Sequence, residues 1–161
     1  MLKIKLLILL LSGVLIGCSF ENYLPKEKLK LSYIGNDIDG LILSELLLIK
    51  LKNNDFYDKE SSLLLKANID HDTNYYLTNI DKTSDRNRVR SLLEISIVSQ
   101  NLGCEVYNYK KGISQFFLVS DSTTFTSNNM ALYDIKKENT KNLVQSFVSK
   151  YRNANLICLN E

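Results

Sequence analysis

Residues Arg86–Ser99 read RNRVRSLLEISIVS, and this stretch decides which fold the chain can adopt. Apolar and polar side chains alternate along it with a period of two, which is the pattern of a β-strand with one buried face. One face carries Val89, Leu93, Ile95 and Ile97, and the other carries Arg86, Arg88, Arg90, Glu94 and Ser96. We therefore predict a long strand inside a sheet, with its apolar side turned toward a covering layer.

The chain after this strand predicts a hairpin and a fourth strand. Asn101-Leu102-Gly103 is typical of a tight turn, so the next strand should run antiparallel to the central one. We expect this fourth strand to pass through Val106 and Phe117 to Phe125, with an interruption near Gly112.

A long amphipathic helix is predicted near the carboxyl end. Ser127-Asn128-Asn129 is suited to cap a helix, which we expect from Met130 to Asn153. Its apolar side chains recur with helical spacing, and its charged residues fall on the other side. The apolar set is Leu132, Ile135, Leu143, Val144, Phe147, Val148 and Tyr151.

The chain before the central strand predicts a strand, a helix and a further strand. Lys28–Ile34 alternates as a short first strand, and Gly35-Asn36-Asp37 then turns the chain and caps a helix over Ile38–Lys52. Alternation resumes at Leu63 and can continue to Leu77, which predicts the second strand. Apolar residues surround the helix on nearly all sides, so we expect its own sheet to cover one side and a partner to cover another.

The order strand, helix, three strands, helix predicts an α+β fold. We expect a four-stranded, mostly antiparallel sheet with the two amphipathic helices packed on one face. The chain has a single proline and no glycine-rich or serine-rich linker, so residues 28–161 should form one domain.

The first residues carry a secretory signal. Two lysines precede an apolar run that ends at Ile16 and is too short to span a membrane. The closing Leu15-Ile16-Gly17-Cys18 resembles the lipobox of bacterial lipoproteins. By that resemblance, residues 1–17 are a signal peptide, Cys18 is the lipid attachment site for acyl chains such as palmitate, and residues 18–27 are a lipidated tether. An ordinary cleaved signal or an uncleaved anchor is the alternative.

The mature chain would be electrically neutral. Cleavage leaves 144 of the 161 residues and reduces the 20 basic residues to 18, which equals the number of acidic ones. A nucleic-acid partner therefore has no support from bulk charge. In an oxidising compartment Cys104 and Cys158 can form a disulfide, or both can remain free buried thiols.

Residues suited to catalysis or metal binding are scarce. His71 is the only histidine, and its parity with Ile69 places it on the apolar side of the second strand, packed or hydrogen-bonded rather than ligating a metal. Asp70-His71-Asp72 cannot act as a triad, because neighbouring residues in a strand point to opposite faces. The sequence contains no Gly-x-Ser-x-Gly elbow and no glycine-rich phosphate loop. We therefore expect no catalytic residue, no metal and no cofactor.

A row of cations is the one constellation with a chemical use. Arginines at alternate positions of a strand share a face, and a guanidinium group binds phosphate with two parallel hydrogen bonds. The candidate site for a phosphorylated glycolipid head group consists of Arg86, Arg88 and Arg90, with Lys82 in the loop before them. The alternative is a solvated face with cross-strand partners such as Glu105 or Asp70. Lys110-Lys111 is a weaker candidate or simply an exposed turn.

Several segments of the mature chain together carry a family resemblance. They are the lipobox, Leu29-Lys30-Leu31-Ser32-Tyr33, Arg88–Ile95, Ser127–Ala131 and Asn139–Leu143. In their order and spacing over Cys18–Tyr151 the chain resembles the LptE-type lipoproteins of lipopolysaccharide assembly. Met130 departs from the family pattern, which usually has an aromatic residue there.

The resemblance implies a protein that is not an enzyme. Members sit inside the barrel of the outer-membrane protein LptD, help that barrel to assemble and bind lipopolysaccharide. We therefore expect a lipid-anchored, periplasm-facing protein of the outer membrane, with an LptD-type β-barrel protein and lipopolysaccharide as partners. The residue after the cysteine is Ser19, which agrees with this location. An aspartate at that position would instead resemble a signal that retains lipoproteins in the inner membrane. The competing class is a subunit of another envelope machine, either a transporter auxiliary lipoprotein or an activator of cell-wall synthesis.

Overall fold

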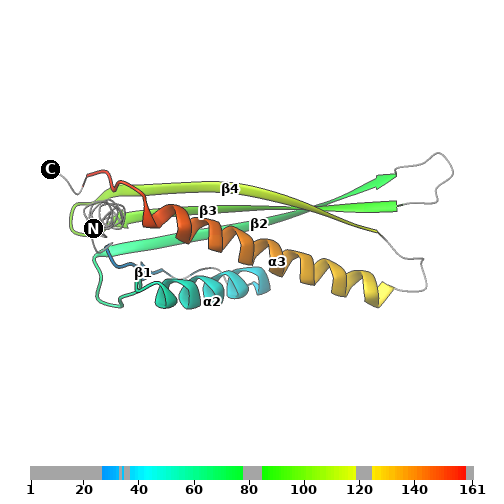
Figure 1. Ribbon diagram of the computed structural model, residues 1–161, viewed down its shortest axis with the longest axis horizontal. Helices are drawn as coiled ribbons and strands as arrows, with labels where there is room; N and C mark the ends of the chain where they lie inside the picture. The colour runs from blue at the N-terminus through cyan, green and yellow to red at the C-terminus, as the bar shows by residue number, and fades with distance from the viewer. Residues whose placement is uncertain (1–26, 33, 35–36, 78–84, 119–124, 159–161) are drawn as a thin grey trace, which may run out of the picture.

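A four-stranded sheet carries two helices on one face, as Figure 1 shows for the computed structural model. The structure describes residues 27–32, 34, 37–77, 85–118 and 125–158. Its elements in chain order are β1 Lys30–Leu31, α2 Ile38–Asn53, β2 Leu63–Leu77, β3 Asp85–Ser99, β4 Cys104–Leu118 and α3 Phe125–Arg152. The predicted α+β fold and its order of elements are confirmed.

The sheet is mostly antiparallel, with the strand order β1-β2-β3-β4. β3 lies between β2 and β4 and pairs antiparallel with both over nearly its whole length. β1 is the exception, because it runs parallel to the first residues of β2, opposite Leu64 and Leu65. This first strand is much shorter than the predicted Lys28–Ile34, since the chain must leave the sheet to reach Asp37, the N-cap of α2.

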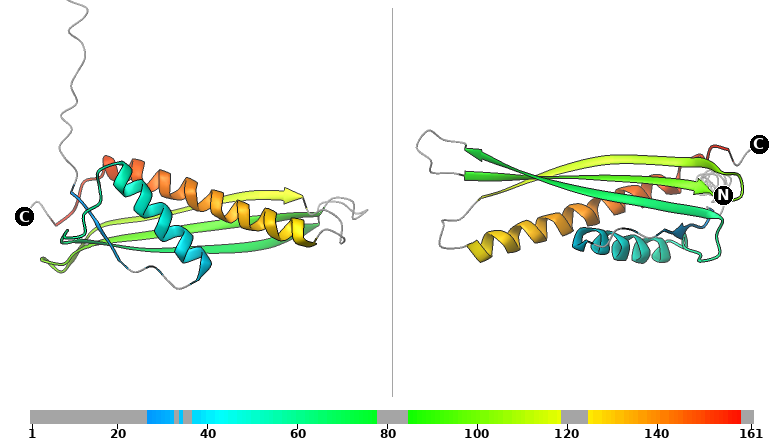
Figure 2. Two further views of the ribbon diagram at one scale, coloured as in Figure 1. Left: turned by 90° about the horizontal axis from the view of Figure 1, so that it is seen from below. Right: turned by 180° about the vertical axis from the view of Figure 1, so that it is seen from behind.

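The central strand has the parity that its sequence predicts. Val89, Leu93, Ile95 and Ile97 are buried on the side that faces the helices. Figure 2 shows α2 and α3 lying side by side over this face of the sheet. The helices complete the core with Leu43, Leu47, Leu51, Leu143, Val144, Phe147, Val148 and Tyr151.

α2 begins at the predicted cap and ends one residue later than expected. The Asp37 side chain accepts a hydrogen bond of 2.8 Å from the backbone amide of Gly40, which satisfies a free donor of the first turn. The outer side of the helix stays apolar, with Ile38 67% and Leu41 60% exposed. Within the described residues, neither helix combines the length and the apolar character needed to cross a membrane.

β4 and α3 differ from the prediction near their connection. β4 is not interrupted at Gly112, because the backbone of this glycine continues the ladder opposite Leu92 of β3. The strand ends at Leu118 rather than at Phe125, which is instead the first residue of α3. Ser127–Asn129 therefore lies inside the helix and does not cap it. Packing of the rest of α3 against the sheet outweighs the weak helix propensity of serine and asparagine.

Both ends of the described chain lie at the same end of the molecule (Figure 1). Cys104 and Cys158 form a disulfide there, which decides between the two interpretations of these cysteines. The backbone amide of Ile157 donates to the carbonyl of Val106 at 3.0 Å and holds the tail along β4. The starts of β3 and α3 lie toward the opposite end, called here the far end.

Leu93→Ala tests the parity of β3. Leu93 is fully buried, so we expect truncation to leave a cavity and to lower the free energy of unfolding by about 2–5 kcal/mol in urea titrations. Leu102→Ala is the matched control, since Leu102 is 58% exposed and its truncation should change stability by less than about 0.5 kcal/mol. A loss below about 1 kcal/mol for Leu93→Ala would show that the assigned burial is wrong.

Candidate functional site

Three arginines lie on the uncovered face of the sheet, near the start of β3. Arg86, Arg88 and Arg90 alternate with Val89 and Ser91, which are fully buried on the helix side. Alternate residues of a strand lie about 7 Å apart, so the three guanidinium groups can meet one extended polyanion. The strand thus places on one face the three arginines that the sequence predicts together, and they are called here the arginine row.

An aromatic side chain of β4 lies beside this row. Phe116 stands directly opposite Arg88 in the register of β3 and β4, and it is 61% exposed. An anion with an apolar part could therefore contact both kinds of side chain. Sequence reasoning missed Phe116 because the expected interruption at Gly112 hid the alternation of the strand beyond it.

Glu105, one acidic partner considered for the arginines, is engaged elsewhere. It lies at the start of β4, toward the other end of the sheet, and accepts hydrogen bonds from Asn108 at 3.0 Å and from Ser96 at 2.8 Å. These bonds, that from Asn108 first, lower the pKa of the Glu105 carboxyl. Glu105 is therefore not a partner of the row.

The aspartates of β2 lie closer to the row. Asp70 is opposite Leu92, whereas Asp72 is opposite Arg90. Within the described residues, neither Arg86 nor Arg90 forms an ion pair. Both guanidinium groups are thus exposed cations that a phosphate could pair with.

The two lysines of β4 do not form a joint site. Lys110 pairs with Glu94 at 2.5 Å on the uncovered face. Lys111 points to the other face, where its ammonium donates to the Ser146 hydroxyl of α3 at 2.7 Å. Neighbouring residues of a strand point to opposite faces, so the pair serves two separate contacts.

The uncovered face also has a hollow of about 410 Å³ nearer its middle. Its polar lining consists of Lys66, Asn68, Glu94, Ser96, Asn108 and Lys110. Because the carboxylate of Glu94 offsets one of its two lysines, this hollow attracts anions less than the arginine row does. The predicted lipid attachment site Cys18 and the predicted loop cation Lys82 lie outside the described residues.

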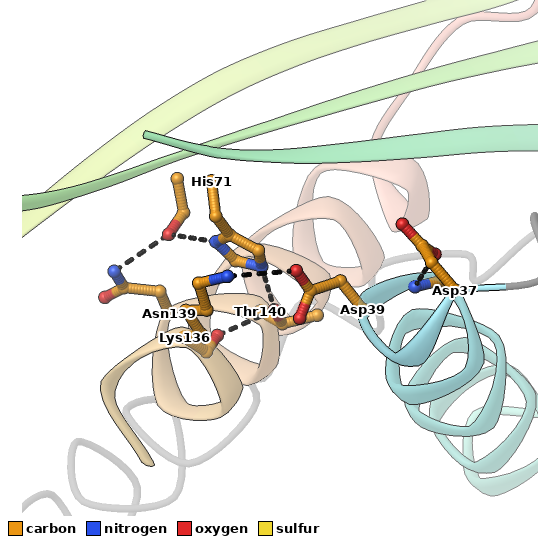
Figure 3. A network of polar contacts seen from close by, with 8 residues as sticks. Asp37, Asp39, His71, Lys136, Asn139 and Thr140 are labelled. Atoms are coloured by element: carbon orange, nitrogen blue, oxygen red, sulfur yellow. Dashed lines mark hydrogen bonds and ion pairs between the residues drawn. The ribbon is translucent and has the colours of Figure 1, made fainter. Parts of the chain in front are cut away.

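His71 lies on the helix side of β2 and is held between the sheet and α3 (Figure 3). Its Nδ1 is 2.7 Å from Ser91 Oγ of β3, and its Nε2 is 3.4 Å from Thr140 Oγ1 of α3. The side-chain amide of Asn139 donates to the same Ser91 hydroxyl at 2.9 Å. His71 is thus a packed, hydrogen-bonded histidine, as its parity in the sequence predicts.

The Ser91–His71 distance is that of a nucleophile and its base. Ser91 is fully buried, however, and its oxygen also accepts the bond from Asn139, so a substrate cannot reach it in this conformation. Asp70 and Asp72 are exposed and belong to the opposite parity of β2. Within the described residues, no three His, Cys, Asp or Glu side chains gather in a way that could hold a metal ion.

An ion pair between the helices borders this network. Lys136 Nζ of α3 lies 3.2 Å from Asp39 Oδ2 of α2, and both side chains are largely buried. Burial, the largest cause, lowers the pKa of His71. Asp39 opposes this shift and Lys136 adds to it, and the smaller effects of Asp70 and Asp37 favour the charged imidazole.

Comparisons with known proteins find similarity in structure but not in sequence. No protein-family model and no curated protein matches the chain. The crystal structure of a minor lipoprotein from Acinetobacter baumannii is similar at a TM-score of 0.60 and 16% identity, covering 80% of this chain and 92% of that one. A Caulobacter crescentus protein described as a lipoprotein is similar at a TM-score of 0.57 and 12% identity, covering 77% of this chain and 87% of that one.

The rare lipoprotein B from Shewanella oneidensis also shares the arrangement of elements. Its structure matches at a TM-score of 0.50 and 15% identity, covering 76% of this chain and 92% of that one. At such identities the likeness establishes the fold alone. The chain therefore has a fold that is found in bacterial lipoproteins.

Proposed function

We propose that this protein is a non-catalytic outer-membrane lipoprotein of the LptE type. In this proposal it faces the periplasm, plugs and helps to assemble an LptD-type barrel, and binds lipopolysaccharide during its insertion into the membrane. The observation that carries the proposal is the arginine row on a sheet face that the protein's own helices leave uncovered. The lipobox-like segment and the fold shared with lipoproteins support it.

The chemistry of the row suits a phosphorylated lipid. Fork-shaped guanidinium donors can bind two oxygens of a phosphate with parallel hydrogen bonds, as they also bind a carboxylate. Phe116 adds an exposed apolar surface opposite Arg88. A glycolipid that carries phosphates next to acyl chains would use both.

The position of the row along β3 suits a domain tethered at one end. β3 ends at Ser99, at the end of the molecule where the described chain begins. At about 3.3 Å per residue, Arg90 and Arg86 lie roughly 30 and 43 Å along the strand from Ser99. The hydrocarbon core of a bilayer is about 30 Å thick, so a plug anchored at one leaflet could present the row about a membrane thickness away.

The outer side of α2 supports a protein partner. Ile38, Leu41 and Ile49 are exposed there, although a helix that is apolar on nearly all sides is normally covered. An LptD-type barrel protein would supply the cover in this proposal. The same observation favours the second candidate, a subunit of another envelope machine, because that role requires a partner for α2 but no lipopolysaccharide.

Mass spectrometry of the mature amino terminus tests the lipid anchor. We expect a chain that begins at Cys18 and carries a diacylglyceryl group and an amide-linked acyl chain, recovered with the outer membrane. Cys18→Ser should leave the precursor unprocessed and without lipid. An unmodified Cys18, or a full-length chain in the cytoplasm, would refute the anchor.

The double variant Arg88→Ala, Arg90→Ala tests the lipid site. Losing a charge-assisted contact costs about 1.5–3 kcal/mol, so binding to purified lipopolysaccharide should weaken at least about tenfold. Arg90 is exposed and should contribute little to folding, whereas Arg88 is half-buried, so the Tm is measured beside binding to separate a loss of stability from a loss of the lipid site. Lys66→Ala, Lys110→Ala is the matched control, as it removes two cations from the same face outside the row. Equal binding by the native protein and the arginine variant would reject the assignment.

Co-purification from detergent-extracted membranes tests the barrel. We expect an LptD-type barrel protein to accompany the native chain, and Leu41→Glu on the outer side of α2 to reduce its recovery. Leu102→Glu is the control, since Leu102 is similarly exposed but lies in the β3–β4 turn. Recovery of a transporter or cell-wall synthase component instead of a barrel would favour the second candidate.

A further inference from the structure

We propose that His71 is a proton-binding site that controls how α3 is fastened to the sheet. Uptake of one proton by its imidazole reverses the Ser91 hydroxyl and turns the side-chain amide of Asn139. Hydrogen bonds that join His71, Asn139 and Thr140 around the Ser91 hydroxyl carry this inference (Figure 3), which is independent of the function proposed above.

One bond in α3 sets the direction of all the others. The Thr140 hydroxyl donates to the carbonyl of Lys136 at 2.8 Å, so towards His71 its oxygen can only accept, from Nε2–H. A neutral imidazole has a single N–H, and Nδ1 is therefore an acceptor for the Ser91 hydroxyl at 2.7 Å. The Ser91 oxygen in turn accepts the bond of 2.9 Å from Asn139 Nδ2. The neutral network is consistent in one tautomer only.

One polar atom stays outside the neutral network. Asn139 is fully buried, and its Oδ1 has no hydrogen-bond partner among the described residues. A buried amide oxygen without a partner is energetically costly. A half turn of the amide would place Nδ2 there instead, so each of the two orientations leaves one polar atom of Asn139 without a partner, and the contact with Ser91 decides between them.

A proton on Nδ1 inverts the chain of bonds. Nδ1–H then donates to Ser91 Oγ, so the Ser91 hydroxyl can no longer donate to the ring and must turn away from it. Its new acceptor is Asn139 Oδ1, once the amide has made half a turn that exchanges Oδ1 and Nδ2. The step takes one proton from water and breaks no covalent bond, and Nε2–H continues to donate to Thr140.

Charged groups from each packed element act on the ring. α2 and its cap contribute Asp39 and Asp37, α3 contributes Lys136, and β2 contributes Asp70, whereas β3 contributes the neutral Ser91. The carboxylates favour the imidazolium, while Lys136 and burial oppose it. Burial is the largest effect, so the pKa of His71 lies below its usual 6.5 and the ring is neutral at pH 7.5.

The sign of the effect on stability follows from this depressed pKa. The unfolded chain binds the proton first as the pH falls below 6.5, since its histidine is not desolvated. Stability from the neutral network is complete above pH 6.5 and is lost as the pH falls through the pKa of the folded state.

NMR of the intact protein in detergent tests the inversion. His71 is the only histidine, so its ring signal can be followed without ambiguity from pH 7.5 downward until the imidazole is fully protonated. We expect the side-chain amide signals of Asn139 to shift with the same midpoint as the ring. In Ser91→Ala the ring should still titrate but Asn139 should no longer follow it. Ser99→Ala, at another buried serine on the same face of β3, should leave the coupling intact.

Two results would overturn the proposal. Either Asn139 does not respond while His71 titrates, or it responds equally in Ser91→Ala. Urea unfolding gives a second criterion that does not depend on that variant's folding. In the native chain, the urea concentration at the unfolding midpoint should be lower at pH 5.5 than at pH 7.5. In His71→Gln it should not decrease in this way. An equal decrease in both proteins would also reject the switch. Neither measurement involves lipopolysaccharide or a barrel, so this proposal and the proposed function can fail separately.

Discussion

The register of β3 is the constraint on which the rest of this structure depends. A slip of one residue would turn Val89, Leu93 and their apolar neighbours outward and would place the arginines beneath the helices. Burying unpaired guanidinium groups is far more costly than any strand pairing can offset. β2 and β4 pair with β3 on either side, so their registers follow from it. The alternation that forms the core therefore also forms the arginine row.

A polar cluster interrupts that core at one level. Ser91 lies between Val89 and Leu93 on the buried face of β3, where α3 supplies Asn139 and Thr140. Buried polar groups are tolerated when they bond to one another, and here three elements must meet in one arrangement to satisfy them. The cluster thus specifies how α3 is placed along the sheet more strictly than interchangeable apolar contacts would.

The sequence predicts the elements whose pattern is local and misses those that depend on tertiary pairing. The period of two in β3 and the Asp37 cap of α2 each involve a few neighbouring residues, and both predictions are confirmed. The true start of α3 at Phe125 and the continuous strand through Gly112 depend on packing and ladder bonds from other segments. The His71 contacts join residues 20 and 69 positions apart, and such proximity leaves no periodic signal in the sequence. The arginine row was predictable because a strand alone brings its members together.

The two ends of the molecule are held by different interactions. At the end where the described chain begins, the Cys104–Cys158 disulfide and the packing of Phe56 and Phe147 against Tyr151 fasten α3 and the tail. Toward the far end, His71, Ser91 and Thr140 take over this role with hydrogen bonds that depend on one proton. Because Ser91 directly follows Arg90 in β3, the proton site and the arginine row occupy the two faces of one strand segment. The face proposed to bind phosphate is thus supported from behind by the buried contacts of Ser91 with His71 and Asn139, whose hydrogen bonds we propose to reverse.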